Sequence, residues 1–98
     1  MVYVTGSFES LKEISSTIDV MYKLQREMPS TCFVSPCNAF SHLRSKELPK
    51  GVLIELRKDL LTCCEKLIVV GELDKYMQEE IKLAELCKME VEYLLERH

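Results

Sequence analysis

The sequence predicts an α/β protein whose parallel sheet is covered by helices on both faces. Short runs of β-branched and aromatic residues alternate along the chain with longer segments whose apolar residues recur every three or four positions. From residue 67 to residue 94 this alternation reads strand, helix, strand, which is the unit that joins parallel strands through a crossover helix. We therefore expect a three-layer sandwich with a four-stranded parallel sheet.

The first half of the chain provides two strands and one helix. Residues 2–5 (VYVT) are typical of a strand and run into a glycine turn. Ser7 or Ser10 can cap the helix that follows, and its apolar positions at helical spacing form a packing face: Leu11, Ile14, Ile18, Met21 and Tyr22. A Met-Pro-Ser break ends this helix, after which residues 31–35 (TCFVS) form a second strand.

The second half adds two helices and two strands after an irregular connection. Residues 37–50 show no clear period, and a polar connection of this length is often a binding loop or a lid. Helical patterns cover residues 51–64 and 74–88, and the strands that follow them span residues 67–70 and 90–94. With right-handed crossovers these elements give a flavodoxin/Rossmann-like sandwich with the strand order 2-1-3-4.

Size and composition indicate one domain and argue against several classes of partner. The 98 residues are 47% hydrophobic and 30% charged, and the net charge of −3 lacks the basic character of a protein that binds nucleic acid or a membrane surface. No secretory signal opens the chain and no apolar run is long enough to span a bilayer, so we expect a cytoplasmic protein. The cysteines and the two histidines match no metal-site spacing, and no dinucleotide or triphosphate motif follows the first strand, so we expect no metal and no cofactor.

The cysteines are expected to be thiols, because an unexported chain meets a reducing environment. Four of them fall on predicted apolar elements, namely Cys32, Cys63, Cys64 and Cys87. We therefore expect these thiols to be reduced and structural.

Glu80 is the most informative residue of the chain. On a helical wheel at about 100° per residue, it falls in the middle of the apolar face of the 74–88 helix, between Met77 and Ala84. One interpretation is structural, with the carboxylate capping loop amides or pairing with a buried base. The other is functional, because ligands of open parallel sheets bind beyond the carboxyl ends of the strands, where such helices begin.

Other candidate residues lie on the preceding helix and at the ends of the strands. Arg57 interrupts the apolar face of the 51–64 helix, either as a side chain that reaches solvent from the flank or as the partner of an anion or carboxylate. Asp59 lies at the edge of that face. The first three strands are expected to end on one edge of the sheet near Glu80. The residues at their ends are Gly6 and Ser7, Ser35 and Pro36, and Gly71 to Leu73.

Several stretches of the chain, taken in order, are similar to the motifs of one family. VYVTGSF is similar to the family's first strand and glycine turn, and FVSP is similar to its second strand. The similarity is densest over RKDLLTCCEKLIVVG and YMQEEIKLAELCKMEVEYL, although Glu65 stands where an aspartate is usual and LDKY replaces the usual small-residue turn. Nearly the whole chain thus resembles the nucleoside 2-deoxyribosyltransferase-like superfamily, most closely its small members of unassigned function, many of them from bacteria and phages.

The resemblance implies the cleavage of an N-glycosidic bond by a glutamate nucleophile. Glu80, with Ala84 four residues later, matches the family's catalytic glutamate, and Asp59 matches a helix aspartate that orients the sugar or shuttles a proton. The ligand implied is a nucleoside- or nucleotide-like small molecule. The residues implied to bind it are Gly6, Ser7, Phe8, Ser35, Pro36, Gly71 and Met77.

A second hypothesis stays open beside the enzyme, namely a non-catalytic module of the same fold that binds a nucleotide-like ligand or a protein. The small size and the altered turn favour this module, whereas the position of Glu80 favours the enzyme. We also expect a homo-oligomer, because three helices leave part of a four-stranded sheet poorly covered and the related transferases build sites across subunits.

Overall fold

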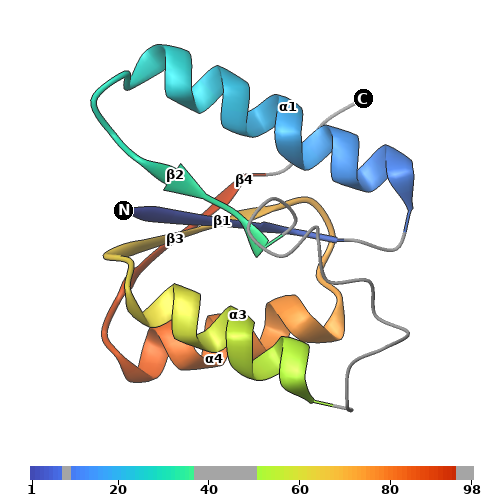
Figure 1. Ribbon diagram of the computed structural model, residues 1–98, viewed down its shortest axis with the longest axis vertical. Coiled ribbons are helices and arrows are strands. Elements are labelled where there is room, and N and C mark those ends of the chain that lie inside the picture. Colours follow the sequence, from blue (N-terminus) through green and yellow to red (C-terminus); the bar gives the residue numbers. More distant parts are fainter. Residues whose placement is uncertain (8–9, 37–50, 95–98) are drawn as a thin grey trace.

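The chain forms three layers, with helix α1 on one face of a central sheet and helices α3 and α4 on the other (Figure 1). The computed structural model describes residues 1–7, 10–36 and 51–94, so the predicted irregular connection at residues 37–50 lies outside the described residues. The elements are β1 (Val2–Gly6), α1 (Leu11–Glu27), β2 (Phe33–Val34), α3 (Val52–Thr62), β3 (Lys66–Val70), α4 (Lys75–Leu86) and β4 (Glu90–Leu94). The predicted α/β sandwich is confirmed.

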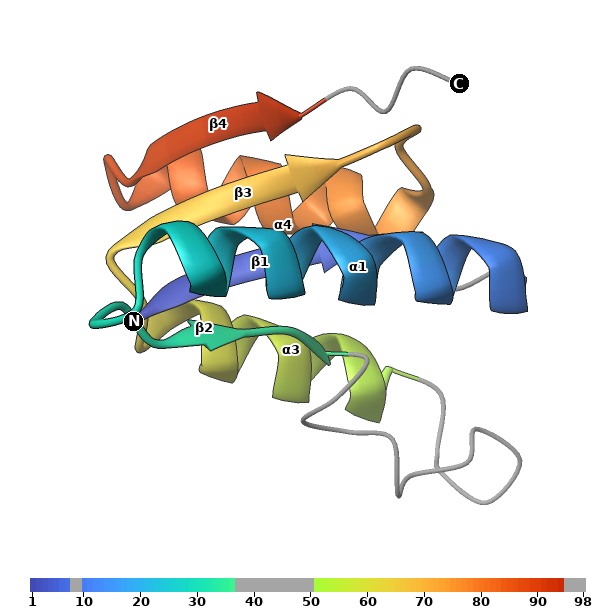
Figure 2. The same cartoon turned by 90° about the horizontal axis from the view of Figure 1, so that it is seen from above.

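The sheet has four parallel strands in the order β2-β1-β3-β4, as predicted. β1 and β3 lie in the middle, with Tyr3 opposite Leu67 and Thr5 opposite Val69. β4 forms one edge of the sheet, and the short β2 forms the other (Figure 2). Because the strands run in the same direction, the carboxyl ends of β1 and β3 lie together at one end of the sheet, where α1 and α4 begin. This end, which is distinct from the two outer strands, is the edge where β1 and β3 end.

Alternating side chains along β1 and β3 divide the core into two clusters. The cluster on the α1 face consists of Val2, Val4, Ile68 and Val70, packed against Val20, Met21 and Leu24 of the helix. The cluster on the other face includes Tyr3, Leu67 and Val69 with Leu61 of α3 and Met77, Ile81 and Ala84 of α4. Thr5 follows Tyr3 on this second face, so β1 directs two hydroxyl groups towards α3 and α4.

Side chains cap both helices that begin at the strand ends. Ser10, one of the two predicted caps, accepts a hydrogen bond at its Oγ from the Glu13 amide at 3.2 Å. Asp74 caps α4 through Oδ1, which accepts from the Met77 amide at 2.8 Å. The predicted helix at 74–88 is therefore shorter at both ends, and after Leu86 the chain turns through Lys88, whose φ is +56°.

The cysteines of the described residues are free thiols, but three of them are not buried as predicted. Cys64 is buried, whereas Cys32, Cys63 and Cys87 are exposed. Cys63 and Cys87 are the C-caps of α3 and α4, where each helix ends. Each predicted helix extends two residues beyond the observed end of the helix.

Candidate functional site

Glu80 lies in the core between α4 and the sheet, where the helical wheel predicted it. It is 2% exposed and belongs to a buried polar cluster with Tyr3, Thr5 and Arg57. Tyr3 and Thr5 come from one face of β1, Arg57 comes from the middle of α3, and Glu80 comes from the second turn of α4. Three elements therefore bring a carboxylate, a guanidinium and two hydroxyl groups together.

Four hydrogen bonds hold the Glu80 carboxylate. Its Oε1 accepts from Arg57 Nη2 at 2.5 Å and from Thr5 Oγ1 at 2.8 Å. Its Oε2 accepts from Arg57 Nε at 3.3 Å and from the Tyr3 hydroxyl. Because a carboxylate offers about four acceptor positions, these bonds use its capacity fully.

Arg57 is the buried base that pairs with Glu80, so the interpretation as a side chain reaching solvent is wrong. It is 1% exposed, and its Nη2 also donates to Thr5 Oγ1 at 3.2 Å. Its guanidinium carbon lies 5.0 Å from the centre of the Tyr76 ring, within the range of a cation–π interaction. Arg57 thus joins α3 to both β1 and α4.

Burial and the ion pair shift the pKa values in this cluster. Burial raises the pKa of Tyr3 far above its usual value, and the Glu80 charge raises it further. Burial alone would lower the pKa of Arg57, but the Glu80 carboxylate more than offsets this and raises the pKa above its usual value. Tyr3 therefore acts as a hydrogen-bond donor and Arg57 as a permanent cation.

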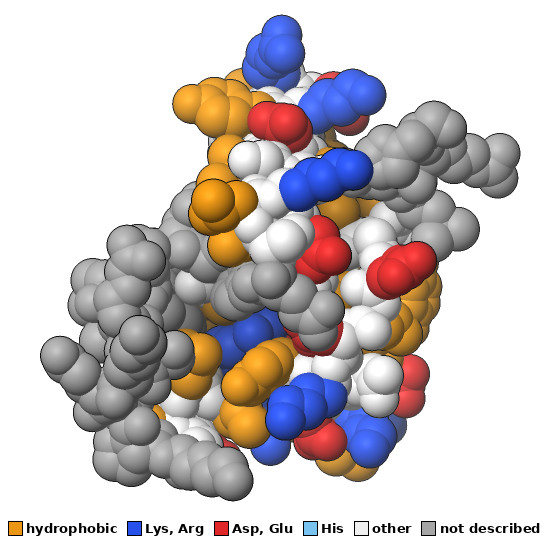
Figure 3. Space-filling view, turned by 90° about the vertical axis from the view of Figure 1, so that its right-hand side faces the viewer, with side chains coloured by type: hydrophobic (Ala, Val, Ile, Leu, Met, Phe, Trp, Pro, Cys, Tyr) orange, Lys and Arg blue, Asp and Glu red, His pale blue; other side chains and the backbone are white. Residues whose placement is uncertain are grey.

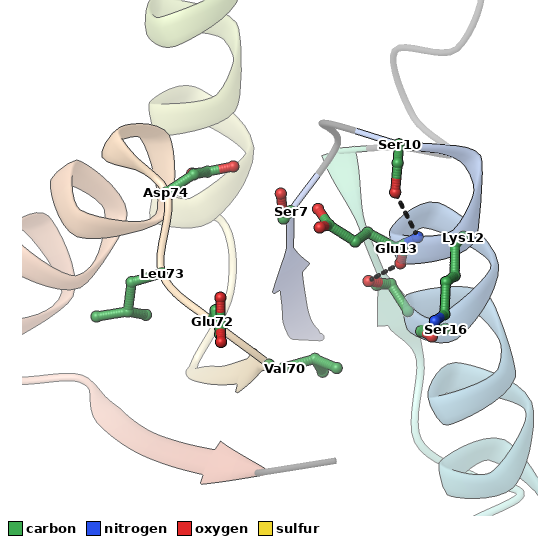
Figure 4. Close-up of a pocket in the computed structure, with 11 residues that line it drawn as sticks. Ser7, Ser10, Lys12, Glu13, Ser16, Val70, Glu72, Leu73 and Asp74 are labelled. Atoms are coloured by element: carbon green, nitrogen blue, oxygen red, sulfur yellow. Dashed lines mark hydrogen bonds between the residues drawn. The ribbon is translucent and has the colours of Figure 1, made fainter. Parts of the chain in front are cut away.

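A pocket of about 330 Å³ opens at the edge where β1 and β3 end, between the start of α1 and the β3–α4 connection (Figure 4). Ser7 and Gly71, both predicted ligand contacts, line it. Thr17 of α1 and Val70 of the α1-facing cluster also line it, so the pocket lies on the α1 face of the sheet. Glu80 lies against the opposite face, so the sheet lies between the pocket and the carboxylate.

Seen from this edge, acidic and basic side chains are interspersed over the surface and no block of one sign dominates it (Figure 3).

The other predicted ligand contacts are buried or lie outside the described residues. Met77 is fully buried in the core under α4, and Ser35 and Pro36 at the end of β2 are buried as well. Gly6 is buried against α1, where an added Cβ would lie 2.0 Å from Thr17 Oγ1. Phe8 is not among the described residues.

Asp59, the second predicted catalytic residue, is not part of the Glu80 cluster. It is exposed on α3, two positions after Arg57, and two positions along a helix turn a side chain by about 200°. Because Arg57 faces the core, Asp59 faces away from it. Its backbone oxygen accepts a hydrogen bond from Thr62 Oγ1 at 2.8 Å.

Two kinds of feature are absent from the described part of the chain. Its His, Cys, Asp and Glu side chains include no group of three or more placed to hold a metal ion. None of its helices combines the length and the apolar character needed to cross a bilayer.

Tyr3 and Thr5 are the members of the cluster that the sequence analysis missed. Their signal is present in the sequence, because they alternate with Val2 and Val4 and give one face of an apolar strand two hydroxyl groups. A buried strand face that carries hydroxyls calls for a polar partner in the opposing layer. Glu80 on α4 and Arg57 on α3 are those partners.

Comparisons with models of protein families, with curated proteins and with solved structures find no match for this chain. The resemblance to the nucleoside 2-deoxyribosyltransferase-like superfamily therefore stays a prediction.

Proposed function

We propose that the chain is a nucleoside- or nucleotide-processing enzyme that cleaves or transfers an N-glycosidic bond with Glu80 as the nucleophile. The observation that carries this proposal is a buried carboxylate whose two oxygens are both oriented by groups from β1 and α3. A buried ion pair often adds little stability compared with well-packed apolar side chains, which is compatible with a functional role for this one. The similarity of Glu80 and Ala84 to the family motif supports the same role.

In the proposed reaction a Glu80 oxygen attacks the anomeric carbon of the sugar while the bond from that carbon to the base nitrogen breaks. The electron pair of the broken bond goes to the base, which takes up a proton, and the sugar is held as an ester of Glu80. Water or the nitrogen of a second base then attacks the same carbon, loses a proton and releases the carboxylate. Water yields the free sugar, and a second base yields a new glycoside.

The hydrogen bonds of Glu80 set a condition on this reaction. An oxygen whose acceptor positions are all filled is a poor nucleophile, so a donor such as the Tyr3 hydroxyl has to leave before the attack. Asp59 faces away from Glu80 on α3, so the proton for the departing base comes from another group.

The same saturation favours a second candidate function, a non-catalytic module that binds a nucleotide-like ligand or a protein partner. In that case the Glu80–Arg57 pair joins α3 and α4 to β1, and any ligand binds elsewhere at the edge where β1 and β3 end. The two functions differ in whether a sugar ever becomes bonded to Glu80.

Covalent trapping on the unaltered protein decides between them. A 2-fluoro-substituted nucleoside slows the release of a glycosyl ester, so the enzyme is expected to gain the mass of one sugar, located by peptide mapping at Glu80. Absence of both trapping and cleavage across a broad panel of nucleosides and nucleoside monophosphates would reject the enzyme and leave the module.

Variants at residue 80 test the role of the carboxylate itself. Glu80→Gln cannot form the ester and should lose cleavage by orders of magnitude, but it also leaves Arg57 buried without its carboxylate, at a cost of about 3–5 kcal/mol. Glu80→Asp keeps the charge and withdraws the carboxylate by one methylene group, so it should fold and still lose most cleavage. Glu79→Gln, an exposed neighbour on the same helix, is the matched control. Undiminished cleavage in folded Glu80→Asp and Glu80→Gln would exclude the nucleophile.

A further inference from the structure

Strand β4 leaves one row of backbone groups free at the outer edge of the sheet. It is the last strand in the order β2-β1-β3-β4, so within the described part of the chain it pairs with β3 alone (Figure 2). The Leu94 oxygen accepts from the Gly71 amide at 3.1 Å, so the backbone groups of Leu94 point towards β3. Because successive residues of a strand direct their backbone groups to alternate sides, Val91 and Tyr93 direct theirs outwards. β4 therefore offers two donors and two acceptors to a further strand.

The side chains of β4 give the two faces of this outer edge different characters. Val91 packs against the core cluster on the face of α3 and α4, and Tyr93 lies on the same face with 54% of its area exposed. Glu90 and Glu92 lie on the α1 face, and both are exposed. The outer edge thus carries apolar side chains on one face and carboxylates on the other.

The two carboxylates on the α1 face keep an excess of negative charge. Lys66 Nζ of β3 lies 4.0 Å from Glu90 Oε2 and 3.8 Å from Glu92 Oε2. One ammonium group is therefore shared between two carboxylates, whose side chains are 73% and 47% exposed. A cation that approaches from the outer side of β4 can pair with either carboxylate, as opposite charges do across neighbouring strands.

A second copy of β4 would fit this outer edge poorly. The two-fold antiparallel pairing that uses both outward residues places Val91 opposite Tyr93, and it brings the two copies of Glu92 face to face. A shift that pairs the two copies of Val91 places Glu90 opposite Glu92. Like charges directly opposite each other are destabilising, and charges on an edge strand commonly prevent pairing between copies. The charge that repels a second copy attracts a basic strand.

We propose that β4 binds an extended basic segment of a partner protein, which pairs with it as an antiparallel strand. Lysine or arginine side chains of the partner lie opposite Glu90 and Glu92, and apolar side chains lie opposite Val91 and Tyr93. Backbone hydrogen bonds supply the affinity, and the alternation of basic and apolar side chains supplies the specificity. The antiparallel direction is favoured because parallel pairing is slightly less stable per residue. This interaction does not involve Glu80, so it is compatible with an enzyme and with a non-catalytic module.

The test is an NMR titration of the uniformly ¹⁵N-labelled chain with a short peptide that alternates lysine and valine and is blocked at both ends. We expect the largest shifts at the amides of Val91 and Tyr93. Two control peptides should bind about tenfold more weakly. One has the same composition with its lysines and valines in separate blocks, and the other alternates glutamate and valine.

N-methylated peptides test the backbone pairing itself. In an antiparallel pair, the valines opposite Val91 and Tyr93 exchange both hydrogen bonds with them, so the valine amides point at β4. Methyl groups on the valine amides should therefore abolish binding. Methyl groups on the lysine amides, which point away from β4, should preserve it.

Variants of the chain test the two carboxylates. Glu90→Gln combined with Glu92→Gln should weaken binding of the alternating peptide about tenfold. The midpoint of thermal unfolding should stay the same, because exposed ion pairs such as those with Lys66 contribute little stability. Glu55→Gln combined with Glu79→Gln removes two exposed carboxylates from α3 and α4 and should bind like the parent chain.

Several results would overturn strand addition at β4. They are equal binding of the block peptide, loss of binding on methylation of the lysine amides, and undiminished binding by the chain with Glu90→Gln and Glu92→Gln. Shifts of the β4 amides that depend on protein concentration without peptide would assign the outer edge to a second copy instead. The absence of any shift in β4 with the alternating peptide would mean that the two glutamates serve to keep other strands away.

Discussion

The polar cluster around Glu80 shows how single residues set the chemistry of an otherwise apolar core. Glu80 was identified from the helical wheel because a carboxylate in the middle of an apolar face needs a partner, and Arg57 was identified by the same reasoning on its own helix. That the two side chains form a pair depends on how α3 and α4 pack side by side on one face of the sheet. Periodicity within each segment carries no information about that packing.

The environment of Glu13 was not predicted, for a different physical reason. Its spacing from Ser10 is that of a capping box, which would have assigned its carboxylate to a local role at the start of α1. Its Oε2 is instead buried without a hydrogen-bond partner among the described residues, and Glu13 lines a pocket together with the β3–α4 connection, a segment about 60 residues away in sequence. A local motif predicts which bonds are available to a side chain, and tertiary packing decides which of them form.

The raised pKa of Tyr3 predicts a loss of stability at alkaline pH. The unfolded chain releases the phenol proton above about pH 10, whereas the folded chain keeps it because burial and the Glu80 charge hold the pKa higher. Below about pH 10 both states hold the proton and stability is unaffected. Above it the unfolded state binds fewer protons, so the free energy of unfolding should fall by about 1.4 kcal/mol per pH unit from this group.

Urea titrations between about pH 8 and 11 of the parent chain and Tyr3→Phe measure this contribution. At about pH 8, where both states still hold the phenol proton, the variant should be less stable by about 1.5–3 kcal/mol, because Glu80 loses a donor. This difference should narrow steadily above about pH 10. Tyr93→Phe on β4, an exposed tyrosine, controls for the loss of a hydroxyl. A difference that stays constant up to about pH 11 would contradict the assignment of Tyr3 as a buried donor.

At the scale of elements, the sequence predicted type and order better than extent. The strand at Glu90–Leu94 has the predicted limits, while β2 shrinks from the expected 31–35 to Phe33–Val34. Only two residues of β2 pair with β1. The run of residues with high strand propensity is therefore longer than the part that forms a ladder with a neighbouring strand. Helix ends were overextended in the same way, because apolar periodicity continues where caps end the helix.

The contact between α1 and β1 depends on the absence of a side chain at Gly6. A Cβ there would lie 2.0 Å from Thr17 Oγ1, and Thr17 is itself buried on the sheet side of α1. Gly6→Ala is therefore expected to reduce the free energy of unfolding by about 1–3 kcal/mol through overpacking. Thr17→Ala removes the hydroxyl that would clash, so the cost of Gly6→Ala should be smaller in that background.

A double-mutant cycle with urea unfolding measures this coupling. Gly71→Ala, where nothing lies within 4 Å of the added Cβ but φ is +74°, serves as a contrast. Its cost comes from the backbone and should be independent of Thr17. Strictly additive effects of Gly6→Ala and Thr17→Ala would show that α1 packs on β1 differently.

At the scale of the whole molecule, the two faces of the sheet are covered unequally. α3 and α4 share one face, whereas α1 alone lies over the other (Figures 1 and 2). Part of the less covered face is polar, since Lys66 of β3 lies within ion-pair distance of Glu90 and Glu92 of β4. The area of apolar sheet that α1 leaves uncovered is therefore smaller than expected for one helix on a four-stranded sheet.

Large apolar side chains nonetheless remain on the surface, and they support the expectation of a homo-oligomer. Among the described residues the most exposed are Leu11 and Tyr22 on α1, at 83% and 69%, and Leu86 on α4 at 82%. Leu11 and Tyr22 were predicted to belong to the packing face of their helix, and that part of the prediction is wrong. Light scattering coupled to size exclusion at micromolar concentration should give a mass of at least twice the 11.4 kDa of one chain.

Leu86→Lys and Leu11→Lys, made separately, show which helix carries the interface, because a charge buried between copies should dissociate them. Lys58→Gln is the control, because it changes a charge on α3 without removing an exposed apolar side chain, and it should leave the mass unchanged. A mass of 11.4 kDa at every concentration would mean that these side chains face solvent singly, as scattered apolar residues do on many monomers.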